Sequence, residues 1–149
     1  MPDFLSKQER SRRMSAIRST NTKLERLFFS TVGSAAHREG YRYRKYYAGL
    51  PGTPDLAFPK HKLAVFVDSS FWHGRNIKAW YRKLRTLYWR RKIEGNIIRD
   101  ASVNTKLRAA GWKVLRIWDA DLLKKPYSCK RKVITRLSEI KYRQPAAIR

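Results

Sequence analysis

The sequence predicts an α/β fold in which a central mixed sheet is flanked by helices. Three observations support this prediction: stretches with helical spacing of apolar residues, short alternating or fully apolar stretches typical of strands, and turns rich in glycine or proline between them. Their order is helix, three strands, helix, strand, helix, which a single sheet covered by helices accommodates. With 149 residues, the chain is long enough for one domain with its own core.

The first predicted helix begins at the capping box Thr22-Lys23-Leu24-Glu25, because Thr and Glu at this spacing satisfy free backbone N–H groups. It is expected to end at Gly40, since glycine favours the backbone conformation that follows a helix. Its apolar face includes Leu24, Leu27, Phe28 and Val32.

Three strands are predicted next. Residues 41–47 alternate aromatic and basic side chains with a period of two. Residues 50–54 contain two prolines and a glycine, and therefore form a turn. Residues 55–58 and 63–67 are strands on either side of the short connection 59–61, and the second is an apolar run typical of a buried strand.

The second half of the chain predicts a helix over residues 89–110, a strand over residues 112–118 and a last helix over residues 131–141. Gly111 stands where the first of these helices should end. The inward face of that helix is expected to hold residues at a spacing of four, namely Ile93, Ile97 and Ala101.

Charge dominates the composition. The chain has 35 Lys and Arg against 11 Asp and Glu, a formal net charge of +24 at pH 7 spread over its whole length. Such an excess implies a polyanionic partner, first of all nucleic acid. Each Lys or Arg side chain that binds a phosphate releases condensed counterions, which favours association. A hydrophobic content of 42 % excludes a disordered basic tail. Charge alone does not separate an enzyme from a binding module.

The densest basic stretch is residues 75–92, which contain no acid and interleave basic residues with aromatic ones. This mixture suits phosphate contact combined with base stacking, and it equally suits a solvated helix face with ordinary core aromatics. A single cysteine, Cys129, excludes an internal disulfide and indicates a reducing compartment. The longest apolar run, residues 63–67, is far too short to span a bilayer.

The positions of the few acids are informative. Asp55 follows a Pro-Gly-Thr-Pro turn at a strand end, where its carboxylate either holds Mg²⁺ or caps the turn. His73 comes soon after the buried strand, and is either structural or able to accept a proton from water. Asp100 is expected on the inward side of its helix, paired with His73 or with a basic residue. Glu25 belongs either to the capping box or to an acidic site.

A series of motifs spans roughly residues 11–123. They are Met14-Ser15-Ala16-Ile17-Arg18, Thr22 to Glu25, Leu50-Pro51-Gly52-Thr53-Pro54-Asp55, Val65-Phe66-Val67, Phe71-Trp72-His73, Trp89 with Lys92 to Asn96, Arg99-Asp100, and Gly111 to Leu115 with Trp118. Their residues, order and spacing resemble the Vsr endonucleases of very short patch mismatch repair, and the related Glu-Asp-x-His-Asp nuclease domains. The resemblance implies a PD-(D/E)XK-like, or restriction-endonuclease-like, three-layer core. It also implies Mg²⁺-dependent cleavage of a DNA strand, in Vsr enzymes as a nick 5′ of the T in a T:G mismatch.

The resemblance further implies roles for individual residues. Asp55 would be the principal metal ligand, joined by the backbone oxygen of Val67. His73 would be the general base, and Asp100 would orient it. Glu25 would complete the acidic shell through water.

DNA contacts follow from the same resemblance. Phe71, Trp72 and Trp89 match an aromatic wedge that inserts beside the mismatched pair, and Met14 and Ile17 match minor-groove contacts. Basic residues of the dense stretch are expected to bind DNA as well, namely Arg75, Arg82, Arg85 and Lys92.

The sequence departs from the family in two places. Vsr proteins hold a structural zinc with three Cys and one His, whereas the matching positions here are Ser70, Arg75, Ile77 and Ala120. We therefore expect Mg²⁺ and no structural zinc. Asp68 and Ser69 replace a histidine and a glycine after the buried strand, and Asp68 is either a further metal ligand or a cap. These changes bear on mismatch specificity more than on nuclease chemistry.

We expect one nuclease domain over residues 1–149, with a basic lead over 1–20, a family-like core over about 11–123 and a helical extension over about 124–149. Its expected partner is double-stranded, mismatched DNA, with repair-pathway proteins as further candidates. It should be a cytoplasmic, nucleoid-associated monomer of prokaryotic or phage type. The alternatives are a site-specific homing or restriction-type endonuclease on the same core, and a catalytically inactive basic DNA-binding protein.

Overall fold

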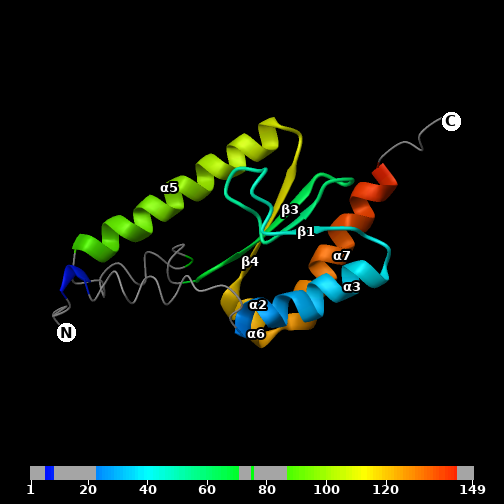
Figure 1. The fold of residues 1–149 in the computed structure, drawn as a ribbon, viewed down its shortest axis with the longest axis horizontal. Helices are drawn as coiled ribbons and strands as arrows, with labels where there is room; N and C mark the ends of the chain where they lie inside the picture. The colour runs from blue at the N-terminus through cyan, green and yellow to red at the C-terminus, as the bar shows by residue number, and fades with distance from the viewer. Residues whose placement is uncertain (1–5, 9–22, 71–74, 76–86, 144–149) are drawn as a thin grey trace.

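The computed structural model describes residues 6–8, 23–70, 75 and 87–143 (Figure 1). Four strands of this part form one sheet in the order β1-β2-β3-β4. β1 (Arg44–Lys45), β2 (Leu56–Phe58) and β3 (Leu63–Asp68) pair antiparallel, and β4 (Lys113–Trp118) runs parallel to β3. The predicted α/β fold with a mixed sheet is confirmed.

Helices cover both faces of the sheet, which gives the three expected layers (Figure 1). α5 (Leu87–Ala109) lies over one face and carries the chain from β3 to the parallel strand β4. The other face is covered by the N-terminal helices α2 (Lys23–Phe28), η1 (Phe29–Gly33) and α3 (Ser34–Arg38), together with α6 (Asp119–Lys124) and α7 (Pro126–Arg143). No helix among the described residues is both long and apolar enough to cross a membrane.

Alternation along β3 divides the core in two, because successive side chains of a strand point to opposite faces. Leu63 and Val65 pack in the cluster that contains residues of α2, α6 and α7. Ala64 and Phe66 face α5 and pack with Leu107. The next residue on the α5 face is Asp68, so a carboxylate continues an otherwise apolar row and is buried there.

The two predicted helix-ending glycines are confirmed. Gly40 and Gly111 have φ of 89° and 84°, a region that glycine enters without steric cost. At each site the N–H of the following residue returns to a carbonyl in the last helical turn: Tyr41 to Ala36, and Trp112 to Leu107, both at 2.9 Å. Gly111 thereby turns the chain from α5 directly into β4.

The strand predicted over residues 41–47 is wrong in length, since β1 is only Arg44–Lys45. Its start is lost because the Tyr41 N–H is used to end the preceding helix. Its end is lost because Tyr46 has φ of 48°, which breaks the extended backbone. The first helix also contains an unpredicted π-helical turn, η1, where Thr31 Oγ1 donates to the Leu27 carbonyl at 2.6 Å.

The predicted inward face of α5 is wrong at Ala101, which is exposed. A spacing of 3.6 residues per turn carries the buried face from Ile93 through Asp100 to Leu107. Asp100 is therefore directed toward the sheet, as predicted.

The last helix is longer than predicted, and α6 was not predicted at all. α7 begins at Pro126, a residue that suits the first helical turn because it lacks an N–H to satisfy. Its buried residues recur at helical spacing: Cys129, Val133, Leu137 and Ile140.

Candidate active site

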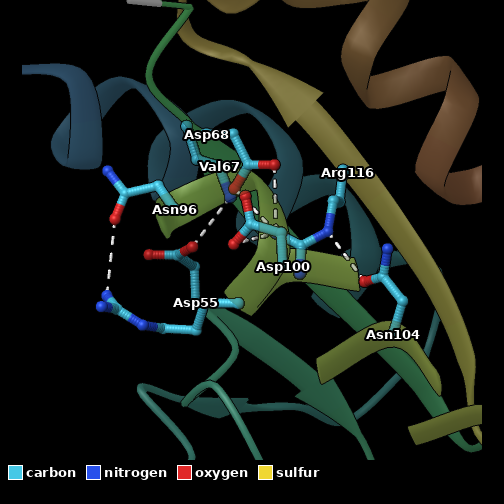
Figure 2. Close-up of polar contacts among 8 residues, drawn as sticks. Asp55, Val67, Asp68, Asn96, Asp100, Asn104 and Arg116 are labelled. Carbon is cyan, nitrogen blue, oxygen red and sulfur yellow. Dashed lines mark hydrogen bonds and ion pairs between the residues drawn. The ribbon is translucent and has the colours of Figure 1, made fainter. Parts of the chain in front are cut away.

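A pocket of about 250 Å³ lies between the inward side of α5 and the ends of β2 and β3 (Figure 2). Four segments contribute to it: the turn before β2, the end of β3, one face of α5 and a side chain of β4. The lining residues that bear on function are Asp55, Val67, Asp68, Asn96, Arg99, Asp100 and Arg116. Asp55, Val67 and Asp100, three of the residues expected at a catalytic site, thus meet at one place.

Asp55 lies at the end of the β2–β3 ladder. Leu56, the first residue of β2, pairs with Val65 and forms the end of the β2–β3 ladder that lies next to Asp55. The next N–H on that side of β3 belongs to Val67, and it donates to Asp55 Oδ2 at 2.8 Å. Because the N–H and C=O of one residue point to the same side of a strand, the Val67 carbonyl is directed to the same side of β3 as that N–H. The Asp55 carboxylate therefore lies beside the Val67 backbone.

The pKa of Asp55 is raised to about 6, chiefly by burial and in smaller part by the charges of Asp68 and Glu25, while the hydrogen bond from Val67 opposes the change. A carboxylate that is costly to ionise beside other acids gains from a divalent cation. Mg²⁺ commonly binds through one or two carboxylates and otherwise keeps its water. Within the described residues no three Asp, Glu, His or Cys side chains form a cage of their own. The donors present therefore fit a magnesium ion held by Asp55, a backbone oxygen and water.

Glu25 reaches this region through Tyr46. The Tyr46 hydroxyl donates to Glu25 Oε2 at 2.7 Å, and the Tyr46 N–H donates to the Asp55 carbonyl at 3.1 Å. Burial and the hydrogen bond to Glu25 raise the pKa of Tyr46, so the hydroxyl remains a donor at neutral pH. Sequence analysis missed Tyr46, because its role depends on the left-handed turn that ends β1.

Arg116 of β4 joins the acids on the α5 side of the pocket (Figure 2). Its Nη1 lies 3.0 Å from both carboxylate oxygens of Asp68 and 3.6 Å from Asp100 Oδ1. Its Nε donates to Asn104 Oδ1 at 2.9 Å. Of the two partners proposed for Asp100, the basic residue is the one present in the described part of the chain.

Sequence analysis also missed Arg116. Strand alternation could have found it, since Val114, Arg116 and Trp118 fall on one face of β4, and the same reading places Asp68 on that face of β3. An arginine on a strand face that packs against a helix needs a partner, and Asp68 is the nearest acid in the parallel register.

Several predicted site residues lie outside the described residues: Met14, Ile17, Phe71, Trp72, His73, Arg82 and Arg85. Trp89 and Lys92 are described. Both are partly buried on α5. Trp89 lies about two helical turns before Asn96 and Lys92 about one turn before it, so both are near the face of α5 that lines the pocket. The Trp89 ring packs edge-to-face on Tyr88 with centroids 5.0 Å apart.

Comparison with known proteins decides the family. A sequence model described as DNA mismatch endonuclease Vsr matches residues 2–79. The chain belongs to the Vsr family. The nicking enzyme V.XorIIP of Xanthomonas oryzae pv. oryzae is 41 % identical over 123 residues, 82 % of this chain and 88 % of that protein. V.NmeDIP of Neisseria meningitidis serogroup C is 38 % identical over 136 residues, covering 88 % and 87 %. The DNA mismatch endonuclease Vsr of Escherichia coli K12 is 31 % identical over 123 residues, covering 82 % and 76 %.

This Vsr protein has hydrogen bonds and an ion pair at the positions matched to zinc ligands. The Ser70 N–H and hydroxyl both donate to Asp119 Oδ1, at 2.9 and 2.6 Å. Arg75 Nη1 lies 2.9 Å from Asp121 Oδ1, and the Arg75 N–H donates to the Ser70 carbonyl at 3.1 Å. The N–H of Ala120 donates to Asp119 as well. Ile77 lies outside the described residues.

Gly52, in the Pro-Gly-Thr-Pro turn of this Vsr protein, sets how closely α5 approaches Asp55. Its φ is 77°, and an added Cβ would lie 2.7 Å from Val103 Cγ1. We expect Gly52→Ala to lower the free energy of unfolding by about 2–4 kcal/mol, because backbone strain and overpacking add. Gly40→Ala is the control, since φ is 89° but no atom lies within 4 Å of its Cβ. Urea unfolding that shows equal losses in both variants would contradict the close contact.

Proposed function

We propose that this Vsr-family endonuclease is Mg²⁺-dependent and nicks one strand of double-stranded DNA beside a T:G mismatch. The endonuclease class follows from family membership. The observation that supports metal-dependent chemistry is the placement of the Asp55 carboxylate beside the Val67 backbone at the end of β3.

The protein's own groups have separate tasks in this proposal. Asp55 and the Val67 carbonyl would hold the ion, which when bound supplies positive charge to the scissile phosphate and the leaving oxygen. His73 would accept the proton of the attacking water, so that hydroxide character develops as the phosphodiester is hydrolysed. Asp100, which lines the same pocket, would orient His73, and Glu25 would act through water.

The decisive test is a nicking assay on otherwise identical duplexes that carry either a T:G mismatch or a T:A pair, with Mg²⁺ titrated from zero. We expect nicks in the mismatched duplex alone, and none in the presence of a chelator. Nicking of a matched duplex at a fixed sequence would favour the site-specific alternative. Binding without cleavage at any Mg²⁺ concentration would favour the inactive DNA-binding alternative.

DNA binding combines charge with aromatic contact. With a net charge of +24, affinity should fall steeply as salt rises, because many counterions are released. The N-terminal half of α5, which carries Trp89 and Lys92, extends past the sheet (Figure 1). An aromatic side chain that enters beside a poorly stacked pair gains more there than in regular duplex.

Trp89→Ala is therefore expected to weaken binding to the T:G duplex more than tenfold, which is on the order of the loss of one stacking contact. Binding to the matched duplex should weaken less than threefold. Tyr142→Ala is a suitable control, since this aromatic is 85 % exposed at the end of α7. Fluorescence anisotropy at fixed salt measures both. Equal losses on the two duplexes would mean that Trp89 is a packing residue.

The purified protein is expected to contain no stoichiometric zinc, because the positions matched to the family's ligands carry no Cys or His. Incubation with a strong chelator should then leave the thermal unfolding midpoint unchanged, since no folding energy comes from a bound zinc. Elemental analysis that finds one zinc per chain would contradict this expectation.

A further inference from the structure

We propose that α7 carries a second DNA-binding surface, so that one molecule holds another duplex segment while its pocket engages the duplex to be nicked. The surface is a row of three basic side chains, Lys132, Arg136 and Arg143, which we call the α7 basic row. The inference goes beyond the proposed function, because it concerns the face of the sheet that lies away from the pocket.

The first support is the excess of positive charge on α7. Its 18 residues include six Lys or Arg and a single acid, Glu139. Among the described residues, no ion pair involves a basic side chain of α7. Lys132 and Arg136 are one helical turn apart, an arrangement in which like charges repel each other and destabilise a helix. A polyanion that binds here removes this repulsion.

The second support is the alignment of the three side chains, all of which are exposed. Positions i, i+4 and i+11 fall on one side of a helix with 3.6 residues per turn. The row spans about 16 Å, since each residue adds about 1.5 Å along the helix axis. Each DNA strand presents a phosphate every ~3.4 Å along the duplex axis. The α7 basic row is therefore long enough to contact several phosphates of one duplex.

The third support is the place of α7 in the fold. Its buried residues pack with Leu63 and Val65 on one face of the sheet, whereas the pocket lies on the face covered by α5. Figure 1 shows α5 and α7 on opposite sides of the sheet. A duplex bound at the pocket would have to bend sharply around the sheet to reach α7 as well, which is costly for so stiff a polymer. The α7 basic row is thus better placed for another segment.

The chemistry of α7 favours DNA over other anionic partners. The apolar side of the helix is buried in the core, so it is not available to enter a lipid surface. A straight row of basic side chains suits the regular phosphates of a duplex better than the acids of a protein, which have no fixed spacing. DNA bound at the pocket also keeps further segments of the same molecule at a high local concentration.

The test uses the full chain in buffer with a chelator, so that binding is measured apart from nicking. An immobilised T:G duplex is saturated with protein, and the capture of a second, labelled duplex without a mismatch is measured. Lys132→Ala/Arg136→Ala/Arg143→Ala should lower the affinity for the second duplex at least tenfold and the affinity for the first less than threefold. The slope of log affinity for the second duplex against log salt should become less negative by about 2–3.

Lys106→Ala/Arg108→Ala/Lys113→Ala is the matched control, since it removes the same charge from exposed positions at the end of α5 and the start of β4. It should change the affinity for the second duplex less than threefold. In urea the α7 variant should be at least as stable as the parent, because alanine favours a helix and a repulsion is removed. Sedimentation of the captured complex should give one protein chain with two duplexes.

Four results would overturn the proposal. They are no capture of the second duplex by the parent, an α7 variant that loses no more affinity than the control, a tenfold loss of affinity for the first duplex in the α7 variant, and two protein chains in the captured complex. The third result would assign the α7 basic row to the duplex that is nicked. Because every readout is binding in the absence of Mg²⁺, a failure of the inference is distinguished from a failure of the proposed nicking reaction.

Discussion

Asp55→Asn should lower the nicking rate by about a thousandfold or more, because several kcal/mol of transition-state stabilisation depend on a held metal. DNA affinity should change less than threefold, since the basic surface supplies most of the binding. Single-turnover cleavage and anisotropy on the same duplex measure the two effects. Full activity of the variant would remove Asp55 from the site.

The same substitution should stabilise the protein in metal-free buffer. The pKa of Asp55 is raised to about 6 from an ordinary value of 3.8, chiefly by burial. The proton is therefore bound more tightly in the folded state. The stability that this gives is fully present below about pH 4 and is lost as pH rises through 6, an upper limit of about 3 kcal/mol. Asn stays neutral and still accepts from the Val67 N–H.

Denaturant unfolding of the two proteins at several pH values measures this effect. At pH 7.5 with chelator present, we expect Asp55→Asn to be more stable than the parent by about 1–3 kcal/mol. Between pH 4 and 7 the free energy of unfolding of Asp55→Asn should fall less steeply with pH than that of the parent. Glu139→Gln, at an exposed position on α7, is the control and should follow the parent. A variant with the parent's pH dependence would show that Asp55 is not the group that titrates.

His73→Ala should reduce the single-turnover cleavage rate by about 10²- to 10⁴-fold, because a positioned base is lost. In the parent the rate should rise with pH through the histidine range and then level off, since only neutral imidazole accepts a proton. Asp100→Asn should move the rise to lower pH and slow the reaction, because a carboxylate beside an imidazolium favours the charged form.

Ionisation of Asp55 is expected to raise the cleavage rate in the same pH range, but varying the Mg²⁺ concentration separates the contribution of Asp55 from that of His73. The metal competes with the proton on Asp55, so that rise should move to lower pH as Mg²⁺ increases. The rise that belongs to His73 should stay in place at saturating Mg²⁺ and be absent from His73→Ala. Cleavage by His73→Ala at the parent rate and with the same pH profile would exclude it as the base.

The parts of the fold that follow local rules could be predicted. Gly40 and Gly111 end helices, the turn before Asp55 starts a strand, and the apolar run of β3 is the buried centre of the sheet. Asp55 and Val67 are adjacent because two neighbouring strands end together. These features depend on spacing along the chain, which the sequence displays.

The parts that depend on contacts between distant segments could not be predicted with the same means. Arg116 acquires its partners from β3 and α5, which lie far from it in the chain. Tyr46 links Glu25 to the Asp55 backbone only because of its positive φ. α6 is a single short helix whose first residue, Asp119, is held by contacts with Ser70. In each case local preference is weak, and tertiary contacts decide.

The contacts at Ser70 and Arg75 fasten the chain on both sides of residues 71–74 to the start of α6, through Asp119 and Asp121. None of them involves sulfur, and the single cysteine, Cys129, is buried in the core. Oxidants that destroy a thiolate–metal link have no target in these contacts. The Arg75–Asp121 pair is about one third exposed, so salt screens it. Nicking rates after peroxide treatment and across a salt series would separate the two sensitivities. Ionic strength therefore acts on the Arg75–Asp121 pair, whereas oxidation of thiols leaves these contacts unchanged.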